Sequence, residues 1–272
     1  MPHRFAVILA AAGKSRRFAD CCTNADNKDC NNVTAFKKPF VDLCGQPVWL
    51  HSAALFAAKD YVRQLIVILS PEDREFFETT YARQIAQWSL ELVDGGAERF
   101  ESIENGLRRV RLDINFVAIH DAARPCVTAK QIDAVFRTAE QFDAAILAVP
   151  LVGTIKRAIL SNSPSVETSS DATPFGHATL LDITATVPRD DLWEAQTPQV
   201  FRRELIVNAF ARRCTANVTD EAQLVENIGH AVKIVPSDRL NLKITTASDL
   251  VLARRLLANT TLSSVKRIIT ER

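Results

Sequence analysis

The strongest constraint on the fold is an alternation of short apolar segments, most of them unbroken, with segments of helical periodicity. Apolar runs of strand length recur at residues 5–9, 65–69, 90–93, 116–119, 145–149 and 232–235. Helical patterns occupy residues 49–58, 71–87, 99–110, 129–141 and 247–257. Strands that are apolar throughout are typical of sheets covered on both faces. The sequence therefore predicts an α/β fold with a mostly parallel sheet sandwiched by helices.

Composition limits the partners and the location that we expect. The chain has 272 residues, 47% of them hydrophobic, which suits one main domain with an appendage. Its 33 Lys and Arg nearly balance 32 Asp and Glu, so no global field favours nucleic acid or an anionic membrane. The apolar runs are shorter than the roughly 18 residues that span a bilayer. No segment resembles a signal peptide, and we expect a cytoplasmic protein.

Two polar segments interrupt this alternation, and the chain also contains six cysteines. Residues 19–36 are Asn-rich and aperiodic, which predicts a long flexible loop, and residues 160–178 are rich in Ser, Thr and Pro, which predicts a surface excursion. The cysteines, at positions 21, 22, 30, 44, 126 and 214, form no CxxC pair, so free thiols are expected. A metal or redox role for Cys21, Cys22 and Cys30 stays open.

The first turn, "LAAAGKSRRF" at residues 9–18, suits a phosphate ligand. It is not a P-loop, because Ile8 stands where that motif needs glycine, and it lacks the three glycines of a dinucleotide fingerprint. Residues 10–13 have almost no side chain, so their N–H groups can approach a ligand closely, and Lys14, Arg16 and Arg17 supply cations. A tight turn with a solvated basic face is the alternative.

Further motifs follow in a fixed order. "KKPFVDLCGQPVWLHS" (37–52) and the first turn together resemble the paired signature of nucleotidyltransferases that make sugar- and alcohol-nucleotides. "GGAERFESIENGL" (95–107), "HDAARP" (120–125), "TDEA" (219–222) and "LNLKIT" (240–245) come next. The whole set, from about residue 5 to 257, resembles the 2-C-methyl-D-erythritol 4-phosphate cytidylyltransferase family. Ribitol-phosphate cytidylyltransferases share nearly the same motifs, so the polyol phosphate stays open.

The resemblance implies a Rossmann-like nucleotidyltransferase fold with a protruding dimerisation arm. It implies one domain at residues 1–258, with the inserted loop 19–36, an arm at about 154–189, and a tail at 259–272. The implied enzyme is a homodimer of isoprenoid precursor synthesis that transfers CMP from CTP to 2-C-methyl-D-erythritol 4-phosphate and releases pyrophosphate, with ribitol 5-phosphate as the alternative acceptor. A non-catalytic nucleotide-binding module is one alternative. A glycosyltransferase is another, although "RDD" at 189–191 is a poor substitute for its DxD metal motif.

The resemblance also implies roles for individual residues. The catalytic cations would be Arg17, Lys38 and Lys243, with Lys37 as a competitor for the second. The nucleotide would contact Ala11, Ala12, Gly13, Gly96 and Ser102. The acceptor substrate would contact Arg124, Thr154, Arg189, Thr197 and Thr219. Asp121 would bind Mg²⁺, which needs only one or two carboxylates beside phosphate oxygens. His120 is expected to be structural, and the chain departs from relatives at Ala97 and Pro188, where several carry Asp.

Overall fold

The computed structural model describes residues 3–13, 37–160, 180–213 and 218–270, with side chains up to residue 258. The chain forms two compact units, Met1–Ala148 with Ala195–Arg272, and Val149–Glu194. The predicted loop 19–36, with Cys21, Cys22 and Cys30, lies outside the described residues, as does Arg17. No helix in the described part of the chain is both long and apolar enough to cross a bilayer.

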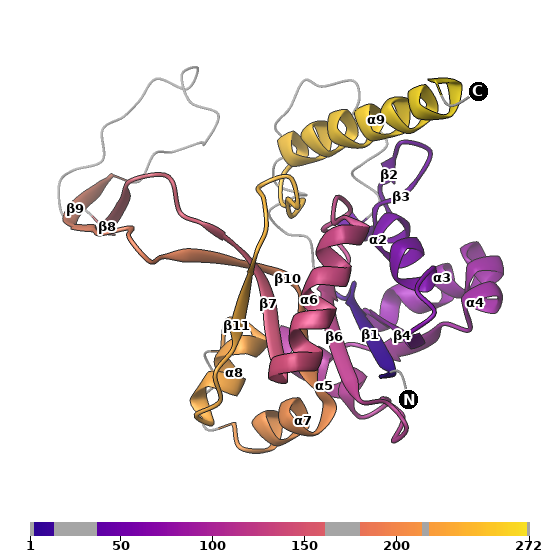
Figure 1. The fold of residues 1–272 in the computed structure, drawn as a ribbon, viewed down its shortest axis with the longest axis horizontal. Helices are drawn as coiled ribbons and strands as arrows, with labels where there is room; N and C mark the ends of the chain where they lie inside the picture. The colour runs from indigo at the N-terminus through magenta and orange to yellow at the C-terminus, as the bar shows by residue number, and fades with distance from the viewer. Residues whose placement is uncertain (1–2, 14–36, 161–179, 214–217, 271–272) are drawn as a thin grey trace. The chain divides into compact units, whose positions relative to one another are not determined.

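The larger unit is built on a seven-stranded sheet in the order β11-β7-β10-β6-β1-β4-β5 (Figure 1). The strands are β1 (Phe5–Ala10), β4 (Val62–Leu69), β5 (Glu91–Asp94), β6 (Phe116–Asp121), β7 (Ala144–Pro150), β10 (Trp193–Arg202) and β11 (Lys233–Pro236). β1 runs parallel to both β4 and β6, β4 is parallel to β5, and β7 is parallel to β11. The predicted α/β class and mostly parallel sheet are confirmed.

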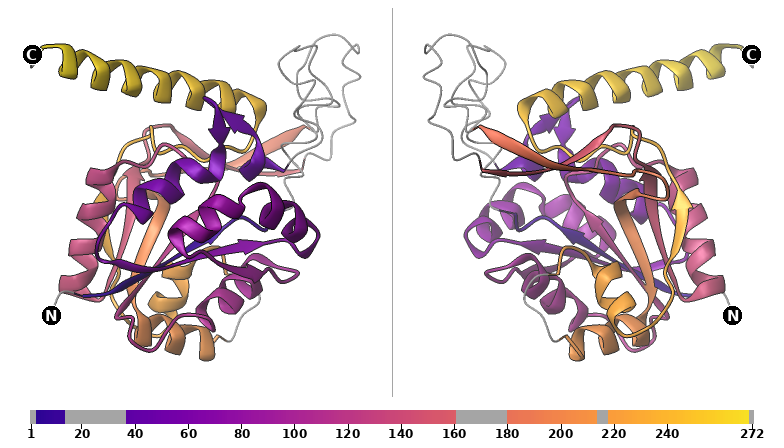
Figure 2. Two further views of the ribbon diagram at one scale, coloured as in Figure 1. Left: turned by 90° about the vertical axis from the view of Figure 1, so that its right-hand side faces the viewer. Right: turned by 90° about the vertical axis from the view of Figure 1, so that its left-hand side faces the viewer.

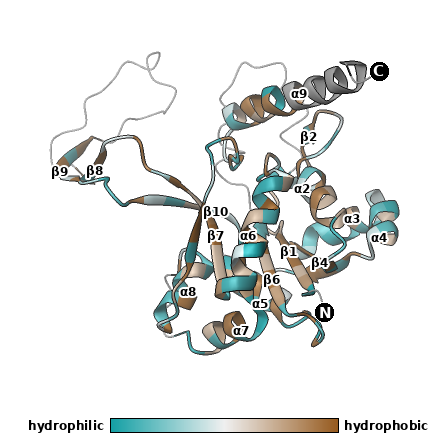
Figure 3. Ribbon diagram, viewed as in Figure 1, coloured by the Kyte–Doolittle hydropathy of each residue, from teal (hydrophilic) through white to brown (hydrophobic). Residues whose placement is uncertain are grey.

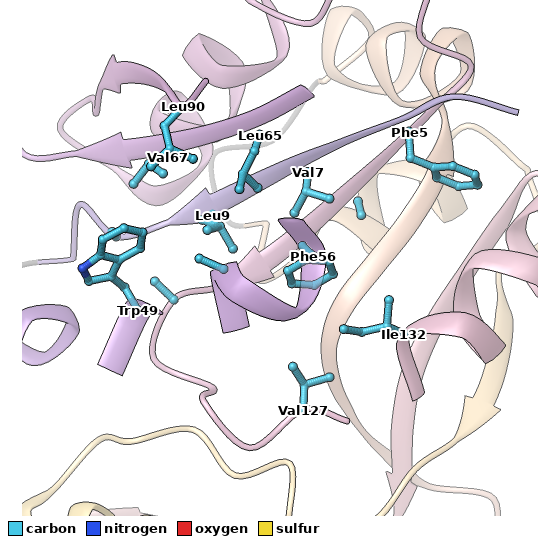
Figure 4. Packing of buried hydrophobic residues seen from close by; sticks show 14 of the residues in the cluster. Phe5, Val7, Leu9, Trp49, Phe56, Leu65, Val67, Leu90, Val127 and Ile132 are labelled. Carbon is cyan, nitrogen blue, oxygen red and sulfur yellow. The ribbon is translucent and has the colours of Figure 1, made fainter. Parts of the chain in front are cut away.

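Side chains of β1 alternate between two apolar layers. Phe5, Val7 and Leu9 belong to a buried cluster with residues of α2 (Val48–Ala57), α3 (Arg74–Thr80) and α6 (Ala129–Phe142), part of which Figure 4 shows. Ala6 and Ile8 belong to a second cluster with residues of α5 (Arg99–Leu107), α7 (Arg203–Ala211) and α8 (Glu221–Asn227). Helices therefore cover both faces of the sheet, which explains why its strands are hydrophobic along their length (Figures 2 and 3).

One strand of the central sheet was not predicted, because several of its buried residues are polar. β10 enters the sheet antiparallel to β6, with Gln199 opposite Ile119. Gln196, Thr197 and Gln199 are all at most 5% exposed, and each makes hydrogen bonds within the larger unit. A hydropathy pattern easily misses such a strand, because three of its side chains are buried through hydrogen bonds instead of apolar contacts.

The predicted helix at 71–87 is wrong in one respect, because the chain is not helical throughout. It forms a short 3₁₀ helix, η3 (Pro71–Asp73), followed by α3 and then α4 (Ala82–Trp88). The two α-helices meet at Tyr81, whose backbone angles are −113° and 24°. The Tyr81 ring is buried and packs edge-on against Trp49, with 5.1 Å between ring centroids. The break thus lies where a side chain turns into the core.

A third, small apolar cluster includes Val48, the first residue of α2. It joins the hairpin of β2 (Asp42–Leu43) and β3 (Gln46–Pro47) to the C-terminal helix α9 (Ala247–Thr270). Its buried members are Val41, Leu43, Val48, Ile244, Leu250 and Ala253. The helix predicted at 247–257 continues to Thr270, so most of the segment expected as a tail is a helical extension.

The smaller unit contains an antiparallel hairpin. Its strands are β8 (Ile155–Leu160) and β9 (Leu181–Val187), with Ile155 opposite Val187. The unit spans Val149–Glu194, a little wider than the arm expected at about 154–189. Residues 161–179 between the strands lie outside the described part.

Candidate functional site

A pocket of about 620 Å³ opens in the larger unit where β1, β4, β5 and β6 end. Carboxyl ends of parallel strands meet at one edge of a sheet, so short segments after these strands converge there. The predicted site residues that line the pocket are Ala11, Ala12, Gly13, Lys38, Gly96, Ser102, Asp121 and Lys243. Residues from five separate motifs of the sequence therefore meet in one cavity.

One wall of the pocket is backbone packed too closely for larger side chains. A Cβ placed on Gly95 would lie 2.7 Å from Ala12 Cβ, closer than carbon atoms can approach. The Gly96 N–H donates to Ser102 Oγ at 3.0 Å, and that hydroxyl donates to the Glu98 carbonyl at 3.0 Å. Ser70 Oγ donates to the Ala12 carbonyl at 3.0 Å. This wall can hold a flat, neutral group against backbone atoms.

In contrast to the neutral backbone wall, charged side chains gather around Asp121, the last residue of β6. Its Oδ2 lies 2.8 Å from Lys243 Nζ and 3.5 Å from Arg124 Nε, and its Oδ1 lies 3.5 Å from Arg99 Nη2. Burial alone would raise the pKa of Asp121, but the charges of Lys243, Arg99 and Arg124 outweigh it and hold the pKa well below its usual range. The carboxylate is therefore ionised throughout the neutral range.

A chain of buried hydrogen bonds holds the backbone of Asp121 in place. The Asp121 N–H donates to Thr197 Oγ1 at 3.0 Å, and the Thr197 hydroxyl lies 3.1 Å from His120 Nδ1. His120 Nε2 lies 3.2 Å from the Arg124 carbonyl, which can only accept. Burial lowers the pKa of His120 to about 4, so the ring is neutral at pH 7, with Nε2 as donor and Nδ1 as acceptor. The ring holds the "HDAARP" segment in shape, as a structural residue would.

Arg124 and Thr197, predicted to contact the acceptor, are buried and do not line the pocket. Arg124 Nη1 donates to the Asn241 carbonyl at 2.8 Å, and Asn241 Nδ2 donates to the Thr197 carbonyl at 3.0 Å. The N–H of Ile244 donates to the Ala123 carbonyl at 2.8 Å. These bonds tie the segment that carries Lys243 to the segment that carries Asp121.

Lys37 and Lys38 have different surroundings. Lys37 Nζ lies 2.7 Å from Glu72 Oε1 and 2.8 Å from Asp73 Oδ2, in two ion pairs. Lys38 begins the 3₁₀ helix η2 (Lys38–Phe40) and lines the pocket, whereas Lys37 does not. The geometry therefore favours Lys38 as the cation that faces a ligand.

Two charged residues of the site were missed from the sequence. Arg99 lines the pocket and forms a two-pronged ion pair with Glu221, in which Nη2 donates to Oε2 at 3.1 Å and Nη1 to Oε1. Burial raises the pKa of the Glu221 carboxyl, and Arg99 opposes that effect. Both residues stand inside recognised motifs, "GGAERF" and "TDEA", but nothing in the sequence shows that the N-termini of α5 and α8 meet.

The structure does not bring three predicted substrate residues into the pocket. Thr219 is exposed before α8, and its N–H donates to Gln223 Oε1 at 3.0 Å. Thr154 and Arg189 belong to the smaller unit, where both are exposed and Arg189 donates to the Val152 carbonyl. Their predicted contacts with the acceptor stay predictions.

Comparison with known proteins agrees with the geometry. The model of the family 2-C-methyl-D-erythritol 4-phosphate cytidylyltransferase (IspD) matches residues 5–259. A relative of that name from Endomicrobium trichonymphae is 34% identical over 252 residues, 93% of this chain and 98% of the relative. Another from Dechloromonas aromatica (strain RCB) is 36% identical over 262 residues, 94% of this chain and 98% of the relative.

Solved structures give the same result. The crystal structure of the Francisella tularensis enzyme of this name superposes with a TM-score of 0.69 at 25% identity, covering 93% of this chain and 99% of that one. A crystal structure of 4-diphosphocytidyl-2C-methyl-D-erythritol synthase gives a TM-score of 0.67 at 26% identity, covering 94% and 100%. The chain therefore belongs to the 2-C-methyl-D-erythritol 4-phosphate cytidylyltransferase family.

Proposed function

We propose that this protein transfers CMP from CTP to 2-C-methyl-D-erythritol 4-phosphate and releases pyrophosphate, in the synthesis of isoprenoid precursors. The observation that carries the proposal is that one pocket combines two kinds of lining. Ala12 and Gly96 present bare backbone, which suits a flat base, and Lys38 and Lys243 supply cations in the pocket that also holds Asp121, which suits phosphates. The names of the relatives supply the identity of the two substrates.

The chemistry requires positioning and charge more than a reacting side chain. An oxygen of the acceptor phosphate forms a bond to the α-phosphorus of CTP while the bond from that phosphorus to the β-phosphate oxygen breaks. Negative charge crowds around the phosphorus, and fixed cations lower the barrier. Lys38 and Lys243 both line the pocket, which supports this role for them. The attacking phosphate oxygen is already ionised, so no general base is needed, and neutral, buried His120 does not have to supply one.

The site also suits Mg²⁺. Magnesium takes one or two carboxylates and fills its remaining positions with phosphate oxygens and water. The described residues contain no cluster of three or more His, Cys, Asp or Glu side chains, so a cage made only of protein groups is not available among them. Asp121 is an ionised carboxylate that lines the pocket, and it would hold the ion together with the nucleotide. When bound, the ion would neutralise charge on the phosphates.

We also propose a homodimer that works in the cytoplasm. The hairpin of the smaller unit exposes Ile159, Leu181 and Ile183, each at least 57% accessible, and this supports contact with a second copy. Cys44 and Cys126 are free thiols, which persist in a reducing compartment.

The direct test is pyrophosphate release by the purified protein with Mg²⁺. We expect release with CTP and 2-C-methyl-D-erythritol 4-phosphate together, and little when either is replaced. Release only with ribitol 5-phosphate would contradict the acceptor, and release only with a purine triphosphate would contradict the nucleotide. Binding of CTP without any release would favour a non-catalytic nucleotide-binding module.

Replacement of Asp121 by Asn tests the role of its charge. The variant keeps the size and the backbone hydrogen bond to Thr197 but loses the carboxylate that Lys243 contacts and that Mg²⁺ would need. We expect turnover to fall by about 100-fold or more. Asp143→Asn is a matched control, because Asp143 pairs with Arg202 outside the pocket and Asn tolerates its φ of 68°. Normal, Mg²⁺-dependent turnover of Asp121→Asn would exclude the metal role.

A further inference from the structure

Arg99 lines the pocket but has no part in the proposed transfer through Lys38 and Lys243. It is the first residue of α5, and 38% of its side-chain surface is accessible. Gly96 and Ser102 of the backbone wall lie on the same segment, and Asp121 lies 3.5 Å from its Nη2 atom. The guanidinium group therefore shares one pocket with the backbone wall and with the Asp121 carboxylate.

Glu221 holds this guanidinium from the side away from solvent. The Glu221 side chain is only 2% exposed, whereas that of Arg99 is open to the pocket. A buried carboxylate is costly unless a cation and hydrogen bonds compensate it, and here both prongs of the Arg99 fork do so. The pair joins the first residue of α8 to the first residue of α5, across 122 positions of sequence. Arg99 is thus anchored by a residue that cannot itself reach a ligand.

The fork leaves capacity for a second anion. A guanidinium group has five N–H donors in a fixed plane, and a two-pronged contact with one carboxylate uses two of them. Asp121 is too distant from Arg99, at 3.5 Å, for a short hydrogen bond. Arginine side chains are common partners of phosphate oxygens, because the guanidinium group is planar, is always charged and can donate two hydrogen bonds at once.

We propose that Arg99 binds a phosphate oxygen of the nucleotide, and that Glu221 is a positioning residue that acts through Arg99. The inference rests on the proposed function for the identity of the nucleotide, CTP. It adds a phosphate-binding residue and its buried support to the lysines of the pocket. It also gives the acidic residue of "TDEA" a role in the site without any contact with substrate.

The test is a double-mutant cycle read out by calorimetric binding of CTP and by kcat and KM. Arg99→Gln should weaken CTP binding roughly 10- to 100-fold, the range expected when a charge-assisted hydrogen bond is lost. Glu221→Gln keeps its shape but loses its charge, and should weaken binding by a smaller factor. In the Arg99→Gln background, Glu221→Gln should add no further loss, because Glu221 would have nothing left to position.

Further variants keep the outcome decisive. Arg99→Lys keeps a charge but loses the fork, so it should recover part of the affinity that Arg99→Gln loses, even if burial of unpaired Glu221 makes Arg99→Gln unstable. The control Arg4→Gln with Asp113→Gln removes a comparable ion pair, 2.8 Å long, outside the pocket, and should leave CTP binding unchanged.

Two results would overturn the inference. One is a folded Arg99→Gln variant, by circular dichroism and thermal unfolding, that binds CTP as the parent does. The other is an effect of Glu221→Gln that persists in full without Arg99, which would make Glu221 a purely structural residue. Both are measured by CTP binding alone. A parent protein that binds CTP but does not use 2-C-methyl-D-erythritol 4-phosphate would instead contradict the proposed acceptor and leave this test intact.

Discussion

Asp121 keeps its negative charge in a buried position because cations surround it on three sides. Lys243 is in direct contact at 2.8 Å, and Arg99 and Arg124 each lie at 3.5 Å. Of these three cations, Lys243 and Arg99 line the pocket, whereas Arg124 is buried and tied to the Asn241 carbonyl. Such a cluster of cations around a carboxylate has the chemistry that the proposed binding of a metal-bound triphosphate would need.

The pair Lys37 and Lys38 offers a test at the same scale. Lys38→Ala removes a cation from the pocket and should lower turnover by about 100-fold, because its charge would stabilise the transition state. Lys37→Ala removes ion pairs with Glu72 and Asp73 and should cost at most about 1 kcal/mol of stability, with turnover nearly unchanged. Kinetics and thermal unfolding of the two variants decide the question. The opposite ranking would assign the catalytic role to Lys37.

At the scale of elements, the small cluster around α9 connects two parts of the site. Val41 follows η2, which begins with Lys38, and Ile244 follows Lys243 directly. Both side chains are buried against Leu250 and Ala253 of α9. The N-terminus of α9 is itself fixed, since Asp249 Oδ2 accepts four hydrogen bonds from Thr245 and Thr246. One helix thus supports two lysines that are far apart in sequence.

Truncation of Leu250 tests whether this support matters. Leu250→Ala should lower the free energy of unfolding by about 2–4 kcal/mol, because it leaves a cavity in the cluster. At temperatures below the unfolding transition it should also lower kcat about tenfold, because the segments that carry Lys38 and Lys243 would be held less rigidly. Leu252→Ala is the matched control, since Leu252 is 52% exposed on the same helix and should change neither quantity much. Full kcat in a destabilised Leu250→Ala variant would show that the cluster stabilises the fold without positioning the lysines.

The strands and helix ends also show which structural features could be predicted from the sequence and which could not. The six predicted strands are all present. Those at the centre of the sheet are buried on both faces, which makes β1, β6 and β7 nearly unbroken apolar runs. β10 escaped prediction because Gln196, Thr197 and Gln199 replace apolar contacts with hydrogen bonds. Motif resemblance located Asp121 and Lys243 but not their contact, and it missed Arg99 with Glu221. Such pairs depend on which helix ends meet, and that is a property of the folded chain.

At the scale of the molecule, the exposed hairpin of the smaller unit supports the proposed homodimer. A two-stranded hairpin is at best marginally stable alone in water. Most described residues of β8 and β9 are exposed, including large apolar ones, so the hairpin buries little surface of its own. A second copy of the chain is the partner that the proposed homodimer provides, and a twofold axis would create two equivalent contacts.

Mixed dimers test whether that contact completes the site. If Arg189 serves the partner's pocket, each site takes Asp121 from one chain and Arg189 from the other. Asp121→Asn and Arg189→Ala chains, each inactive alone, should then form mixed dimers with one doubly defective site and one intact site. With random pairing about half of the dimers are mixed, so roughly a quarter of the sites should recover activity after co-refolding. Differential tags would verify that mixed dimers form. Their complete inactivity would place Arg189 in the site of its own chain, because neither site of a mixed dimer would then be intact.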